Sequence, residues 1–379
     1  MSPAPRLLVL TPDFPPAVGG IQRLLGCVCA HLAAEYQITV VTPTQGGASG
    51  DGGAAVEVIG TRAAWGGRAT SAVLVEMAAR AARSRADLIL VGHLACLPAA
   101  AVAARTAPIV LWAYGSELWS PRGRMVLRCF GHRIDRALAI SEFTAAELRA
   151  QGLPGERISV CPPGIEPDAA PDPDVARAVL TRLDLWHDGA PAPYVVCVAR
   201  LSEPHKGHEL LLRTWPAVSA RHRDARCVIV GSGPLEHRFR VIADYADADA
   251  PVIFTERVAE TDKHALLAGA RALVMASTIE PAAAQFEGFG LTYLEAALFG
   301  RPSIAADCAA PPEVVRDGET GLLVTPGDGV SLFVAIDRVL QDPALADRLG
   351  SAARERVHRG GLWASRMPAI RAALHEART

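Results

Sequence analysis

The sequence has almost no lysine. It contains 38 basic residues, but only Lys206 and Lys263 are lysines, so arginine carries nearly all of the positive charge. Forty acidic residues balance the basic ones, and the formal net charge is −2. A chain with so little net charge has no overall field that would recruit nucleic acid or an anionic membrane.

Signals for export, membrane insertion and zinc binding are also lacking. The apolar run Leu7–Leu10 is too short for a secretory signal. The longest uncharged stretch, residues 88–104, is interrupted by Pro98. It therefore predicts a buried strand and an Ala-rich helix rather than a membrane span. None of the eight cysteines forms a C-x-x-C pair, which favours reduced, buried thiols. We expect a soluble, cytoplasmic protein.

Short β-branched and aliphatic runs recur along the chain, each followed by a helical pattern. This alternation predicts an α/β fold with doubly wound parallel sheets. The predicted strands are Leu7–Leu10, Ile38–Val41, Val56–Ile59, Leu88–Val91, Ile109–Trp112, Leu138–Ile140, Val195–Val198, Cys227–Val230, Val252–Phe254, Ala272–Met275, Ser303–Ala305 and Leu322–Val324.

The alternation pauses between Pro162 and Pro193, where prolines and aspartates are dense and residues 174–185 look like a single helix. This pause predicts two Rossmann-like domains, residues 1–165 and 166–360. A C-terminal helix at 361–379 is expected to pack back on the first domain. Because ligands of such sheets bind at the carboxyl ends of the strands, we expect the active site in the cleft between the domains.

The most informative stretch runs from Glu287 to Glu295 and reads EGFGLTYLE. Gly288 and Gly290 would let the backbone approach a ligand closely. The helix that follows offers unpaired N–H groups and a positive dipole end, which suit an anion. The two carboxylates could then bind sugar hydroxyls on either side of a phosphate. An acidic residue that complements the helix dipole, together with a solvated Glu, would give the same pattern.

Two cations follow the predicted strand that ends at Val198. Arg200 and Lys206 lie where ligands of the sheet are expected, and together they could hold a diphosphate. The scarcity of lysine suggests that the small ammonium is needed here, although a chance surface lysine remains the alternative.

Two glycine-rich segments follow other strands. Gly19-Gly20 precedes a helical pattern and could present backbone amides to phosphate, or could simply form a tight turn. Gly231-Ser-Gly233 lacks the third glycine of a dinucleotide fingerprint, and no acidic residue is placed to hold a ribose, so a nicotinamide cofactor is disfavoured.

Taken in order, these segments resemble the retaining family-4 glycosyltransferases of the GT-B fold, over almost the whole chain. The segments that carry the resemblance are DFPPAVGGIQ at 13–22, PPGIE at 162–166, RLSEPHKG at 200–207, EGFGLTYLE at 287–295 and DGETGLLV at 317–324. The opening segment and the EGFG region are most similar to phosphatidylinositol mannosyltransferases. Glycosyltransferases of antibiotic pathways share the general pattern.

The resemblance implies a transferase that uses a UDP- or GDP-sugar, needs neither a metal nor another cofactor, and retains the anomeric configuration by a front-face mechanism. By analogy, Arg200, Lys206 and Glu287 would be catalytic. The donor-binding residues would be Gly19, Gly20, Arg200, Lys206, Glu287, Gly288, Phe289, Gly290, Leu291 and Glu295. The acceptor would be a small polyol, a cyclitol or aminocyclitol natural product, or a glycolipid. Its candidate contacts are Gln22, Tyr114 and Glu117.

This chain departs from the family at one position. Members often carry His-Gly-x-Glu where this chain has Tyr114-Gly-Ser-Glu117, and that histidine contacts the donor sugar. A phenol can donate a hydrogen bond but is not a cation at neutral pH. Two alternatives therefore stay open: an epimerase or phosphorylase of the same fold, and a non-catalytic protein that binds a sugar nucleotide.

A basic, partly apolar segment runs from Arg122 to Arg136. In relatives with lipid acceptors, such a segment of the first domain touches anionic membrane. A solvated helix face is the simpler explanation, and peripheral membrane contact stays a hypothesis.

Overall fold

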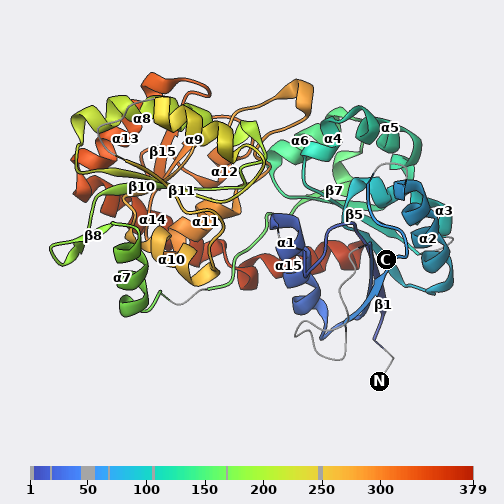
Figure 1. Cartoon of the computed structure of the whole chain (residues 1–379). Helices are drawn as coiled ribbons and strands as arrows, with labels where there is room; N and C mark the ends of the chain where they lie inside the picture. Colours follow the sequence, from blue (N-terminus) through green and yellow to red (C-terminus); the bar gives the residue numbers. More distant parts are fainter. Residues whose placement is uncertain are drawn as a thin grey trace. The chain divides into compact units, whose positions relative to one another are not determined.

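The computed structural model describes residues 4–17, 19–43, 56–66, 69–104, 107–167, 170–245 and 251–378. The chain divides into two compact units (Figure 1). Unit 1 comprises Met1–Gly164 and Trp363–Thr379, and unit 2 comprises Ile165–Leu362. The boundary predicted from the sequence, 165/166, lies one residue after the observed one, and residues 363–379 of the segment predicted as the C-terminal helix belong to unit 1. In the described residues, no helix is both long enough and apolar enough to span a membrane.

Unit 1 is built on a parallel sheet of seven strands in the order β3-β2-β1-β4-β5-β6-β7. The chain winds outward from β1 in one direction and from β4 in the other, so the topological switch point lies between these two strands. The strands are β1 (Arg6–Leu10), β2 (Gln37–Thr42), β3 (Val56–Gly60), β4 (Leu88–Val91), β5 (Ile109–Ala113), β6 (Arg136–Ala139) and β7 (Ile158–Val160).

Helices cover the sheet of unit 1, and residues of β1, β4 and β5 are buried against them in one apolar cluster. The helices are α1 (Gly20–Leu32), α2 (Ala69–Arg83), α3 (Leu97–Ala103), α4 (Ser116–Trp119), α5 (Pro121–Phe130), α6 (Glu142–Ala150) and α15 (Trp363–Glu376). Pro98 occupies the first turn of α3, as expected from the sequence.

The last helix, α15, packs beside α1 in unit 1 (Figure 1). The ring of Trp363 lies 6.2 Å from that of His31, and Arg371 Nη2 donates to the carbonyl oxygen of His31 at 3.0 Å. A Cβ atom on Gly164 would lie only 2.6 Å from the backbone nitrogen of Trp363, so the glycine of the Pro-Pro-Gly segment lets α15 begin directly against it.

Unit 2 contains a parallel sheet of six strands in the order β12-β11-β10-β13-β14-β15, with its switch point between β10 and β13. The strands are β10 (Tyr194–Val198), β11 (Arg226–Val230), β12 (Val252–Phe254), β13 (Ala272–Met275), β14 (Ser303–Ala306) and β15 (Gly321–Val324). An antiparallel hairpin of β8 (Trp186–His187) and β9 (Ala190–Pro191) precedes the sheet.

Both faces of the unit 2 sheet are buried. Along β10, Val195 and Cys197 belong to one apolar cluster, whereas Tyr194 and Val196 belong to another. This explains why the strands are continuous apolar runs rather than alternating ones. The covering helices are α7 (Pro173–Arg182), α8 (His208–Arg221), α9 (Glu236–Tyr245), α10 (Glu260–Gly269), α11 (Leu291–Leu298), α12 (Pro311–Val314), α13 (Gly329–Gln341) and α14 (Pro343–Gly360).

Every strand named from the sequence is present, and the doubly wound α/β prediction is confirmed. The strand predicted at 138–140 starts two residues earlier, and the helix predicted at 174–185 ends at Arg182. Sequence reasoning missed β7 and the β8–β9 hairpin. These are strands of two or three residues at an edge or outside the main sheets, where no continuous apolar run is required.

Candidate functional site

Two loops meet at the switch point of unit 2. One follows β10 and carries Arg200, Glu203 and Lys206, and the other follows β13 and leads to Glu287. The backbone N–H of Thr278 in the second loop donates to the carbonyl oxygen of His205 in the first at 2.7 Å. The site therefore lies at the sheet edge where ligands of doubly wound folds bind.

Lys206 and Glu287 form an ion pair between these loops. Lys206 Nζ lies 2.9 Å from Glu287 Oε2 and 3.6 Å from Glu203 Oε2, and the side chains of Lys206 and Glu287 are 17% and 10% exposed. Burial alone would lower the pKa of Lys206, but the two carboxylates outweigh burial and raise the pKa above its ordinary value. Lys206 is therefore a stable cation at the switch point.

Arg200 is linked to this ion pair through Glu203. Its guanidinium donates to Glu203, while its side chain remains 68% exposed. The sequence predicted that Arg200 and Lys206 lie together, and the structure joins them through Glu203. Sequence reasoning gave Glu203 no role, although its position three residues from each cation was a usable signal.

Glycines bring the backbones of the site together. Gly207 has φ of 81°, and a Cβ atom there would lie 2.3 Å from the carbonyl oxygen of Ala276. A Cβ atom on Gly231 would lie 2.1 Å from the carbonyl oxygen of Ala199, beside Arg200. Leu201 N–H also donates to the carbonyl oxygen of Ser232 at 3.0 Å. The Gly231-Ser-Gly233 segment thus packs against the Arg200 turn, which accounts for its glycines without a dinucleotide.

Helix α11 begins directly after this site. Gly290 precedes it with φ of 90°, and no side chain caps its first N–H groups. A Cβ atom on Gly290 would lie 2.4 Å from the ring of Tyr293, so only glycine fits there. The uncapped N-terminus, next to Glu287 and Lys206, is suited to bind an anion. Gly288 and Phe289 lie in the turn before this helix, and Leu291 is its first residue, where the sequence predicted the helix to begin.

Glu295 lies on the second turn of α11 and is 6% exposed. Its Oε1 atom accepts a hydrogen bond from Lys263 Nζ at 3.0 Å, and Lys263 also pairs with Glu260 at 2.7 Å. The chain's two lysines therefore bind the two glutamates of the EGFGLTYLE segment, one each. The sequence identified Lys263 as rare but gave it no role.

The switch point of unit 1 gathers a second set of polar residues. Asp13 follows β1, and its Oδ1 atom accepts a hydrogen bond from Gln22 Nε2 at 2.7 Å. A Cβ atom on Gly19 would lie 2.3 Å from Gln22 Oε1, so this glycine leaves room for the amide of Gln22. Gly20 starts α1, whose N-terminus no side chain caps.

Tyr114 and Glu117 follow β5 at the same edge of the sheet. Glu117 Oε1 accepts the backbone N–H of Tyr114 at 2.7 Å. Burial raises the pKa of Glu117 to about 7, and the charge of Asp13 contributes in the same direction. Burial likewise raises the pKa of Tyr114, whose phenolic oxygen is fully buried and has no partner in the described part of the chain. Gln22 and Glu117 thus bind other residues of unit 1.

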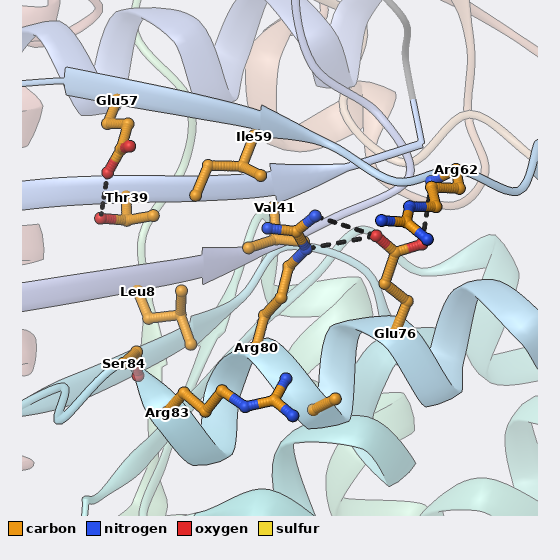
Figure 2. A pocket seen from close by; sticks show the side chains of 11 residues that line it. Leu8, Thr39, Val41, Glu57, Ile59, Arg62, Glu76, Arg80, Arg83 and Ser84 are labelled. Atoms are coloured by element: carbon orange, nitrogen blue, oxygen red, sulfur yellow. Dashed lines mark hydrogen bonds and ion pairs between the residues drawn. The ribbon is translucent and has the colours of Figure 1, made fainter.

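A separate cavity of about 700 Å³ lies between α2 and strands β1–β3 (Figure 2). Glu76 and Arg80, one turn apart on α2, pair at 2.9 Å, and Thr39 binds Glu57 at 3.4 Å (Figure 2). None of the site residues predicted from the sequence lines this cavity. Its size alone therefore does not make it the candidate active site, because the convergent charged groups predicted from the sequence lie elsewhere.

The described residues contain no cluster of three or more His, Cys, Asp or Glu side chains that could hold a metal ion. The charged side chains at the unit 2 switch point instead form two ion-paired groups, Arg200–Glu203–Lys206–Glu287 and Glu260–Lys263–Glu295.

Comparison with known proteins identifies the family. The model described as "Glycosyltransferase Family 4" matches residues 18–169, and "Glycosyl transferases group 1" matches residues 192–342. A GDP-mannose-dependent alpha-(1-6)-phosphatidylinositol monomannoside mannosyltransferase of Mycolicibacterium smegmatis is 32% identical over 95% of this chain and 96% of its own. The chain belongs to glycosyltransferase family 4.

Further relatives and solved structures are also similar to this family-4 glycosyltransferase. The Corynebacterium glutamicum GDP-mannose-dependent monoacylated alpha-(1-6)-phosphatidylinositol monomannoside mannosyltransferase is 30% identical over 96% of both chains. Among solved structures, sucrose-phosphate synthase from Thermosynechococcus elongatus has a TM-score of 0.81 at 22% identity, covering 98% of this chain and 100% of its own. Anabaena HepE in complex with UDP and glucose has a TM-score of 0.79 at 20% identity, covering 98% and 99%. The fold is that of GT-B glycosyltransferases, and the chain is an enzyme that uses a nucleotide sugar.

Proposed function

We propose that this enzyme transfers a hexose from a nucleotide sugar to a hydroxyl of a cyclitol, either free or linked to a lipid, with retention and without a metal. GDP-mannose is the first donor to test, because relatives matched over almost the whole chain are named as GDP-mannose-dependent. Their names, and that of the D-inositol 3-phosphate glycosyltransferase of Acidothermus cellulolyticus (35% identical over 52% of this chain), share inositol on the acceptor side.

The observation that carries the proposal is the Lys206–Glu287 pair beside the uncapped start of α11. Lys206, Arg200 and the first N–H groups of α11 would bind the diphosphate, and Glu287 would bind a sugar hydroxyl. Glu295 would accept hydrogen bonds from the ribose. Positive groups that are already in place stabilise the charge that develops on a leaving phosphate without the cost of reorganisation.

In the proposed reaction the bond between the sugar C1 and the phosphate oxygen breaks, while a bond from C1 to the acceptor oxygen forms on the same face. The acceptor proton passes to a phosphate oxygen of the departing nucleoside diphosphate. The protein contributes orientation and charge, which together can supply much of the rate enhancement.

Helix α5 is the candidate contact with a lipid surface that bears the acceptor. Arg122, Arg124 and Arg128 are exposed on this helix, and Met125 beside them is 60% exposed. The other two arginines of the basic segment bind backbone carbonyl oxygens of unit 1. These are Arg133, which donates to Ala101 and Ala104, and Arg136, which donates to Glu156. Only the first part of the predicted segment is therefore available for peripheral contact.

The test is the slow hydrolysis of UDP-, GDP- and dTDP-sugars by the purified chain, with and without EDTA, followed by transfer to inositol or phosphatidylinositol monomannoside. We expect release of nucleotide from one donor, unaffected by EDTA, and an axial anomeric product by NMR. Lys206→Ala should lower turnover about a hundredfold or more. Arg213→Ala, which breaks an exposed ion pair on α8, is the matched control.

A near-normal rate for Lys206→Ala would refute the diphosphate assignment. Loss of activity on addition of EDTA would refute metal independence, and an inverted product would refute the front-face mechanism. If the chain binds a nucleotide sugar but neither hydrolyses nor transfers it, the proposed transfer reaction is wrong.

A further inference from the structure

A histidine to which sequence reasoning gave no role follows β4 at the switch point of unit 1. Strand β4 pairs with β1 on one side and with β5 on the other. Residues after β4 therefore lie between the loop of Asp13 and the loop of Tyr114. Gly92 N–H donates to the carbonyl oxygen of Leu10 at 2.9 Å, so the chain is still held against β1 immediately before His93.

The imidazole of His93 is held in one tautomer. Its Nδ1 atom accepts the backbone N–H of Ala95 at 3.1 Å and caps the short 3-10 turn Leu94–Cys96. An Nδ1 atom that accepts a hydrogen bond carries no proton, so the proton of the neutral ring is on Nε2. Burial lowers the pKa of His93 to about 4, which keeps the ring neutral at physiological pH.

The Nε2–H group of His93 is available to a ligand. It has no hydrogen-bond partner in the part of the chain that the structure describes. Unlike the phenolic oxygen of Tyr114, it is not enclosed, and His93 is only half-buried. The ring of Trp65 stands nearly perpendicular to the imidazole, with ring centroids 6.4 Å apart.

We propose that His93 binds the acceptor by donating its Nε2–H to an acceptor oxygen, and so helps to place the attacking hydroxyl. This inference rests on the proposed transfer reaction. The acceptor candidates from the sequence bind within unit 1 or are enclosed by it, since Gln22 binds Asp13, Glu117 binds the Tyr114 N–H, and the phenol is buried. With Nδ1 engaged and Nε2 protonated, His93 orients the acceptor and does not remove its proton.

Two substitutions of His93 separate the hydrogen bond donated by Nε2–H from the capping of the 3-10 turn by Nδ1. In His93→Asn, the side-chain oxygen lies close to the position of Nδ1 and keeps the cap, but nothing reaches the position of Nε2. In His93→Gln, an amide N–H reaches that position and the cap is lost. If His93 only caps the turn, the Asn variant should behave more like the wild-type enzyme. If His93 binds the acceptor, the Gln variant should keep acceptor binding better.

The experiment measures transfer from GDP-mannose to phosphatidylinositol monomannoside in detergent, with the donor KM, the acceptor KM and the rate of donor hydrolysis. For His93→Asn we expect an acceptor KM about 3- to 10-fold higher, as for the loss of one hydrogen bond, with unchanged donor KM and hydrolysis. His93→Gln should keep the wild-type acceptor KM even though its Tm is lower.

An unchanged acceptor KM in His93→Asn, or an equal rise in both variants, overturns the assignment. If the wild-type enzyme hydrolyses GDP-mannose but transfers nothing to this acceptor or to inositol, the proposed acceptor class is wrong and the assignment falls with it. The behaviour of the wild-type enzyme therefore distinguishes failure of the proposed function from failure of the role of His93.

Discussion

Replacing Glu117 by Gln should stabilise the protein at neutral and alkaline pH. Burial raises the pKa of Glu117 from 4.5 to about 7. Between these two values the unfolded chain loses a proton that the folded chain keeps, so stability falls as the pH rises from about 4.5 to 7 and is then level. A shift of this size corresponds to about 3 kcal/mol. Because the residue is partly exposed, we expect a gain of about 1.5–3 kcal/mol for the variant at pH 8.

The assay is thermal unfolding of the Glu117→Gln variant and the wild-type chain between pH 4.5 and 8. A unit of this size should gain roughly 3–12 °C in Tm at pH 8 and nothing at pH 4.5. Asp135→Asn is the matched control, because the Asp135 carboxylate also accepts one backbone N–H, from Ile109 at 2.8 Å. Tm differences that do not change with pH would refute the reasoning. If the Glu117→Gln variant has a changed acceptor KM, the acceptor-binding role that the sequence predicted for Glu117 would be supported again.

Two further substitutions test unit 2. His208 is fully buried, neither ring nitrogen has a partner among the described residues, and burial lowers its pKa to about 4. Below pH 6.5 the unfolded wild-type chain binds a proton at His208 that the folded chain does not. The His208→Phe variant should therefore be more stable than the wild-type chain by about 1 kcal/mol at pH 7 and by more at pH 5, as measured by urea unfolding. A difference in unfolding free energy that does not change with pH would count against this. Glu203→Gln removes a carboxylate that neutralises Arg200 and Lys206, so calorimetry should show GDP bound about 5- to 10-fold more tightly. Unchanged or weaker binding would show that Glu203 positions the cations instead.

The central strands of the two sheets could be predicted from the sequence because they are buried on both faces. A strand such as β10 must be apolar at every position, and its run Tyr194–Val198 is therefore visible without any partner. Strand β7 could not be found in this way. It lies at the edge of its sheet, and its residues Ile158–Val160 are only half-buried. The edge strands β3 and β12 could still be found because each contains a run rich in valine and isoleucine, whereas β7 has only three residues with Ser159 at its centre.

Side chains near the site were predictable as a group but not in their pairing. The sequence placed Arg200 and Lys206 after a strand and Glu287 just before a helix, and the parallel topology brings them together. The hydrogen-bond partner of Glu117 was not predictable, because the spacing of residues does not show that its carboxylate turns back to the backbone N–H of Tyr114. His93 was passed over for a related reason. A single histidine after a strand has no motif, and its importance appears only when the hydrogen bond to Nδ1 fixes which nitrogen is free.

The geometry around Lys206 gives a physical reason for a lysine in a chain that otherwise relies on arginine. Its ammonium group approaches Glu287 at 2.9 Å and Glu203 at 3.6 Å in a space that leaves the side chain 17% exposed. An ammonium has three N–H donors arranged around one small atom, so two can point to the carboxylates while the third remains for a ligand oxygen. A guanidinium would spread the same charge over a larger planar group, and a fork bound to Glu287 would fill the space that a diphosphate needs. Lys206 can thus hold the loops together and still bind a donor, which an arginine at this position could not do without moving one of the carboxylates.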